Sequence, residues 1–125
     1  MNTLTLTTKD NAAEFAPGQL IEGLAGWQMD EPPRDAFLRL FWYTQGRGTQ
    51  DVSLVQELEL PHQQADCQQP FQFAVPGEPY TFSGALISLQ WAIELVLNKG
   101  RDVQRLDILV SPWTEKLTLT SLEMK

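Results

Sequence analysis

Between residues 87 and 97 apolar side chains occupy every odd position, and three of the even positions are polar. The odd positions carry Ile87, Leu89, Trp91, Ile93, Leu95 and Leu97. Successive side chains of a β-strand point to opposite faces, so this period of two is typical of a strand with one face in a hydrophobic core. The run therefore predicts a long strand, which restricts the chain to folds that contain a sheet.

The same region has an alternative interpretation as a helix. Ser83 is a suitable N-cap and Gly100 a suitable C-terminal stop, and the Ala, Leu and Glu residues between them favour helix. Six consecutive alternating positions, with strand-like runs on either side, favour the strand instead. A helix here would change the predicted class from all-β to α+β.

The rest of the chain repeats the alternating pattern in short runs separated by Pro and Gly. Gly23 and Gly26 interrupt the second run, which predicts a β-bulge or a bend there. In the fourth run Val52, Leu54, Leu58 and Leu60 occupy even positions, which predicts that they share one buried face. About eight runs are present, around residues 4–6, 19–29, 36–43, 52–60, 71–75, 87–97, 106–110 and 117–119. The pattern predicts an all-β protein, a two-sheet β-sandwich of about eight strands.

Length and composition predict one domain over residues 1–125. The chain has 125 residues, 42% of them hydrophobic, which suits a single core. Sixteen acidic residues against nine basic ones give a net charge of −7, which disfavours nucleic acid and anionic membranes as partners. The single Cys67 allows no internal disulfide, and no apolar run is long enough for a membrane helix. We therefore expect a cytoplasmic protein without membrane insertion.

Several segments resemble the arrestin-like domain superfamily. They are Gly18–Gly23, Leu40–Gly48, Phe71–Pro76, Pro76–Gly84 and Ala85–Leu95. The most specific is a Pro-rich turn with an aromatic residue and a Gly that leads into an apolar strand, as in arrestins, the retromer arrestin-like subunit and sporulation-control proteins. The match spans about residues 18 to 97 in the family's order. It implies an immunoglobulin-like, arrestin-type sandwich without catalytic residues. Arrestins have two such domains and this chain one, and the paired-Lys phosphate sensor is missing, so receptor-phosphate recognition is not implied.

The residue types that commonly carry catalysis or bind metals form no assembled set. His62 and Cys67 lie five residues apart, but a nucleophile would need a third orienting group and zinc would need further ligands. The segment Gly46–Gly48 lacks the third Gly of a phosphate loop and predicts a turn. Asp30, Glu31 and Asp35 lack the Asp-x-Asp spacing of a calcium loop. We therefore predict no catalytic, cofactor-binding or metal-binding residue, and no cofactor.

One surface feature predicts a binding function. In the run 36–43, Phe37, Phe41 and Tyr43 would project from the face opposite Leu38 and Leu40. Aromatic side chains on the outer face of a sheet are costly unless covered, either by a partner or by another part of the chain. An inverted register would place them inside instead.

These residues, with Trp27, are the candidate partner-binding residues of a non-enzymatic interaction or scaffolding module. The expected partner is another protein or a second copy of the chain, as in a homodimer formed through an exposed sheet edge. The alternative is a carbohydrate-binding or small-ligand-binding sandwich, in which Trp27, Trp113 or Tyr80 would stack on a sugar ring.

Overall fold

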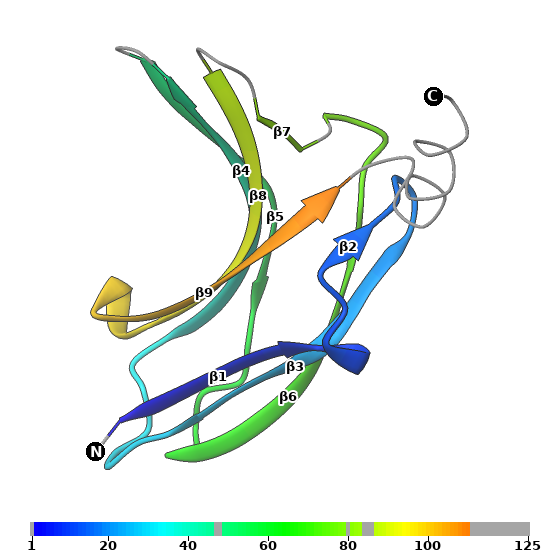
Figure 1. Ribbon diagram of the computed structural model, residues 1–125. Coiled ribbons are helices and arrows are strands. Elements are labelled where there is room, and N and C mark those ends of the chain that lie inside the picture. Colours follow the sequence, from blue (N-terminus) through cyan, green and yellow to red (C-terminus); the bar gives the residue numbers. More distant parts are fainter. Residues whose placement is uncertain (1, 47–48, 80, 84–86, 111–125) are drawn as a thin grey trace, which may run out of the picture.

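The computed structural model describes residues 2–46, 49–79, 81–83 and 87–110. These residues form nine strands and two short 3-10 turns, η1 (Lys9–Asn11) and η2 (Asn98–Gly100) (Figure 1). The strands are β1 (Thr3–Thr8), β2 (Glu14–Phe15), β3 (Leu20–Gln28), β4 (Ala36–Gly46), β5 (Thr49–Glu59), β6 (Asp66–Ala74), β7 (Phe82–Ser83), β8 (Ile87–Leu97) and β9 (Asp102–Val110). The alternative interpretation of residues 83–100 as a helix is therefore wrong, because residues 87–97 form strand β8. The strand predicted around residues 117–119 lies outside the described residues, as do Arg47 and Gly48 of the predicted turn.

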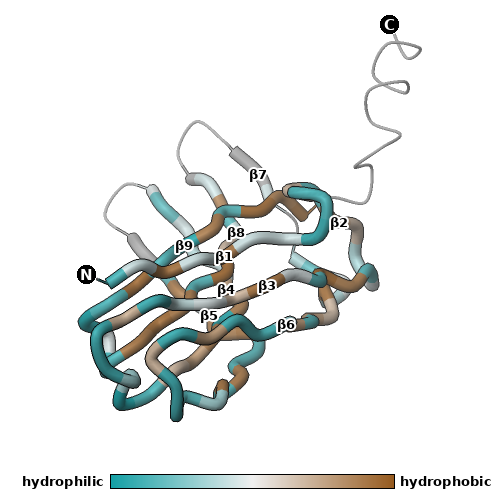
Figure 2. Tube along the Cα trace, turned by 90° about the horizontal axis from the view of Figure 1, so that it is seen from below, coloured by the Kyte–Doolittle hydropathy of each residue, from teal (hydrophilic) through white to brown (hydrophobic). Residues whose placement is uncertain are grey.

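The strands form two sheets. The small sheet has the order β1-β3-β6, and the large sheet has the order β2-β9-β8-β4-β5 with β7 beside β8. Every pairing is antiparallel except that of β2 with β9, which is parallel. Figure 2 shows the small sheet lying across the large one, with hydrophobic stretches on strands of both. The predicted all-β, two-sheet sandwich is confirmed. The 3-10 turns span three residues each, so no helix in the described part of the chain is long enough to cross a bilayer.

The core lies between the sheets and is built by the predicted alternation. Leu38 and Leu40 from β4 and Trp91 from β8 are fully buried, and they lie in one cluster with Ile21 and Phe73 of the small sheet. Burying an indole requires an acceptor for its N–H group. The Trp91 Nε1–H group donates to the Pro79 carbonyl at 3.0 Å, so this ring is buried without an unsatisfied donor.

The two glycines of β3 do not produce the predicted bulge. The registers of β3 with β1 and with β6 run without a shift from one end to the other. Gly23 instead allows a close approach: a Cβ atom there would lie 2.1 Å from the Thr7 carbonyl oxygen and 2.7 Å from the Phe71 ring. Of the predicted bulge or bend, the bulge is therefore absent, because the missing side chain at Gly23 makes room for neighbouring strands rather than for an extra residue.

Candidate interaction surface

Strand β4 carries the predicted ladder on the face of the large sheet opposite the core. Ala36, Leu38 and Leu40 are fully buried on the inner face. Phe37 and Tyr43 are half-buried, and the Phe41 and Tyr43 rings lie 6.0 Å apart on the other face. The predicted register of β4 is therefore correct. The structure brings three of the four candidate residues, Phe37, Phe41 and Tyr43, onto this outer face.

Two arginines cover the rings of this outer face. The Arg105 guanidinium, from β9, lies 5.3 Å from the ring centroids of both Phe41 and Tyr43. The Arg39 guanidinium lies 5.8 Å from the Phe37 ring. A cation over an aromatic face is attracted by the ring quadrupole, and the arginine stem adds apolar contact. This covering explains why Phe41 is 6% exposed although it is on the outer face.

Each covering arginine is held in place by a glutamate. Arg39 Nε lies 2.6 Å from Glu57 Oε2, and Arg105 Nη2 lies 3.3 Å from Glu94 Oε2. Exposed pairs of this kind contribute little to stability, about 0 to 1 kcal/mol each. Their main effect is geometric, because they fix the guanidinium planes over the aromatic rings.

Replacing Arg105 by alanine tests this covering. We expect Arg105→Ala to lower the free energy of unfolding by about 1–2 kcal/mol, since contact with two rings is lost. The measurement is the shift of the urea midpoint at unchanged slope. Arg101→Ala is the matched control, because Arg101 is exposed and lines the hollow formed by segments 29–34 and 98–102 rather than the outer face. Equal midpoints for the two variants would contradict the role of Arg105.

Beside Tyr43 the outer face opens into a shallow groove of about 440 Å³. Val52 and Leu54 of β5 form one wall and are 71% and 53% exposed. Phe41 and Tyr43 form the other wall, and the rest of the lining comes from the two arginine–glutamate pairs with Thr44 and Gln45. The groove therefore combines exposed aliphatic side chains, an aromatic ring and fixed charges.

The exposure of Val52 and Leu54 corrects the prediction that they share a buried face with Leu58 and Leu60. Leu40 pairs with Gln56 and Phe41 pairs with Leu54, so the register of β4 with β5 shifts by one residue and leaves Val55 without a partner across the ladder. This β-bulge switches the face on which the following side chains lie. Val55 and Leu58 pack against the core, whereas Val52 and Leu54 lie on the outer face.

Trp27, the fourth candidate, is a core residue. It is 1% exposed, and its Nε1–H group donates to the Gln64 carbonyl at 2.9 Å. The prediction that Trp27 contributes to a binding surface is wrong, because position 27 faces inward with Ile21 and Ala25. Sugar stacking on Trp27 is excluded for the same reason, and Trp113 and Tyr80 lie outside the described residues.

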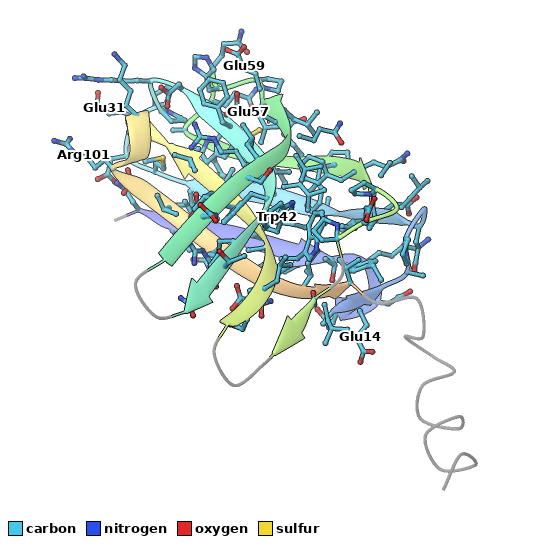
Figure 3. The ribbon with its side chains drawn as sticks, turned by 90° about the horizontal axis from the view of Figure 1, so that it is seen from above. Glu14, Glu31, Trp42, Glu57, Glu59 and Arg101 are labelled. Atoms are coloured by element: carbon cyan, nitrogen blue, oxygen red, sulfur yellow. The ribbon has the colours of Figure 1, made fainter. Side chains whose placement is uncertain are left out.

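A polar hollow of about 790 Å³ lies at the end of the sandwich where the segment 29–34 meets the turn 98–102. Asp35 Oδ1 accepts a hydrogen bond from the Lys99 backbone N–H at 2.8 Å, and Asn98 Oδ1 accepts one from the Arg34 backbone N–H at 2.8 Å. Figure 3 shows Glu31 and Arg101 at this end of the molecule. The hydrogen bonds of Asp35 and Asn98 tie two connections together, which is a structural role.

His62 and Cys67 have local contacts. His62 Nδ1 lies 3.2 Å from the Pro33 carbonyl oxygen, and Cys67 Sγ accepts a hydrogen bond from the Gln69 side chain at 3.2 Å. Among the residues that the structure describes, no three His, Cys, Asp or Glu side chains are grouped as metal ligands would be.

Comparison with known proteins shows the fold. No protein-family model and no curated protein sequence matches the chain. Among solved structures, the sporulation control protein Spo0M from Bacillus subtilis is similar with a TM-score of 0.65 and 14% identity, over 98% of this chain and 55% of Spo0M. A superoxide reductase (neelaredoxin) from Ignicoccus hospitalis is similar with a TM-score of 0.51 and 10% identity, over 87% of this chain and 80% of that one. The chain thus spans about half the length of Spo0M, with which it shares the arrestin-type sandwich.

Proposed function

We propose that the chain is a non-enzymatic interaction module of arrestin-like type, and that a protein partner binds the outer face of the large sheet. The observation that carries the proposal is the exposure of Val52 and Leu54 next to Tyr43. Exposed aliphatic side chains that adjoin an aromatic ring and arginines have the composition of interface cores, in which Tyr and Arg are enriched. The resemblance to Spo0M, whose name denotes a control protein, agrees with a regulatory role.

The arrangement of charges supports binding rather than catalysis at this groove. Arg39 and Arg105 are engaged with Glu57 and Glu94, and both guanidinium groups lie against aromatic rings. Four charged groups are thereby used to hold the shape of the surface. A partner that inserts an apolar side chain between Tyr43 and Leu54 would bury the exposed apolar area and leave these pairs at the rim.

Partner capture from a native lysate tests the proposal. We expect Tyr43→Ser and Leu54→Ser, each coupled to beads, to retain less than about a tenth of the partner that the wild-type chain captures, which corresponds to a loss of about 1.4 kcal/mol. Leu24→Ser is the matched control, because Leu24 is 41% exposed on the small sheet. The proposal requires a protein that the wild type and Leu24→Ser capture and the other two variants lose. An identical set of captured proteins for all four would contradict it.

A further inference from the structure

Strand β5 provides an open edge of the large sheet. It is eleven residues long and ends the strand order of that sheet, with β4 as its neighbour on one side. Edge strands are commonly protected by proline, by shortness or by covering elements. Strand β6 has Pro70 in its middle, β2 has two residues, and β1 lies beside β9. Among the residues that the structure describes, none of these protections is present at the half of β5 that precedes the bulge.

The backbone groups of Val52 and Leu54 point away from β4. The Asp51 N–H group donates to the Thr44 side-chain oxygen at 3.1 Å, so position 51 directs its backbone groups toward β4. N–H and C=O groups alternate in direction along an antiparallel strand. Positions 52 and 54 therefore present theirs to the open edge, while their side chains lie exposed on the outer face.

We propose that two copies of the chain pair through this edge, with their β5 strands antiparallel around a two-fold axis at Ser53. Val52 of each copy then lies opposite Leu54 of the other, and both residues exchange N–H···O=C bonds across the axis. The two large sheets become one continuous sheet. This inference goes beyond the proposed function, because it concerns the purified chain alone and needs no other protein.

The distribution of acidic residues selects this register. If the axis were at Leu54, Asp51 of one copy would lie opposite Glu57 of the other. If it were at Val55, Asp51 would lie opposite Glu59. Both registers are disfavoured, because like charges directly opposite one another are destabilising. Figure 3 shows Glu57 and Glu59 together at the far end of β5. Pairing centred on Val52 would not bring Leu54 opposite an apolar residue. The register centred on Ser53 keeps the acids apart and brings the exposed aliphatic side chains of both copies into contact on the outer face.

The small sheet does not extend as far as the start of β5 (Figure 1). In Figure 1 the end of the large sheet where β4 ends and β5 begins extends beyond the small sheet. Each copy has a net charge of −7, so the copies repel one another at long range. We expect the dissociation constant to fall as salt screens this repulsion.

Cysteine cross-linking tests the register. Positions paired without hydrogen bonds across an antiparallel ladder have Cα atoms about 4.5 Å apart, which suits a disulfide. In a Cys67→Ser background, which removes the native thiol, Ser53→Cys should form a disulfide-linked dimer under mild oxidation. Gln56→Cys, on the same strand but far from the axis, should remain a single chain. A Ser53→Cys chain that oxidises no faster than Gln56→Cys would overturn the proposal.

Sedimentation equilibrium tests the association itself. The wild-type chain should approach twice its 14.2 kDa mass with increasing concentration and salt. Val52→Lys combined with Leu54→Lys should raise the dissociation constant at least about tenfold, because four cations would meet at the axis. Tyr43→Ser leaves β5 unchanged and should still dimerise, which separates this proposal from partner capture. A wild-type chain that stays at the mass of one copy, or dimerises equally well with both lysines, would overturn it.

Discussion

Gly23→Ala is expected to destabilise the chain by about 3 kcal/mol or more, above the usual range for overpacking. The new Cβ atom would lie 2.1 Å from the Thr7 carbonyl oxygen, a backbone atom that cannot move without shifting β1. It would also lie 2.7 Å from the Phe71 ring, which is 6% exposed in the core. Both neighbouring strands of the small sheet would therefore have to separate from β3. Urea denaturation followed by tryptophan fluorescence measures the loss as a lower midpoint.

Gly77→Ala is the matched control for this prediction. Apart from Gly77 and its two chain neighbours, no atom of the described residues lies within 4 Å of a Cβ at this position. The same substitution is therefore expected to change the free energy of unfolding by no more than about 0.5 kcal/mol. Since a domain of this kind is stable by about 5–15 kcal/mol, a loss of about 3 kcal/mol would remove roughly a fifth to three fifths of its stability. Midpoints that agree for the two variants would show that β3 does not have this close packing.

The strands that form the core could be predicted because their pattern is local. In β8 the six apolar odd positions follow from the sequence alone, and Trp91, Ile93 and Leu95 are fully buried as expected. Burial of alternate residues requires no knowledge of which strand pairs with which. The same reasoning placed the aromatic residues of β4 on the outer face.

The groove could not be predicted because it depends on pairing between strands. Val52 and Leu54 are exposed because β5 has a bulge opposite the Leu40–Phe41 step of β4, and neither run signals it alone. Arg105 covers Phe41 and Tyr43 from β9, which is separated from β4 by β8. The three aromatic residues of β4 were therefore predicted on the correct face, whereas Trp27 is a core residue. The prediction also lacked the aliphatic wall of the groove and its charged cover.

Trp27 shows how an isolated aromatic residue misleads sequence interpretation. It lies in a run with two glycines, where the alternation of Ile21, Ala25 and Trp27 is weakened by the absent side chain at position 23. The structure restores the pattern, because the Phe71 ring fills the space above Gly23. The burial of Trp27 therefore follows from the packing of β6 against β3.

Trp27→Ala is accordingly expected to destabilise the chain by about 3–5 kcal/mol, as large-to-small core substitutions of Trp do. The substitution removes a 1% exposed ring and its hydrogen bond to the Gln64 carbonyl, and it leaves a cavity between the sheets. Val52→Ala is the comparison, because Val52 is 71% exposed and its loss should cost no more than about 0.5 kcal/mol. Thermal unfolding followed by circular dichroism measures both. Equal stability of Trp27→Ala and Val52→Ala would contradict the role of Trp27 in the core. The hypothesis that Trp27 stacks on a sugar ring would then have to be considered again.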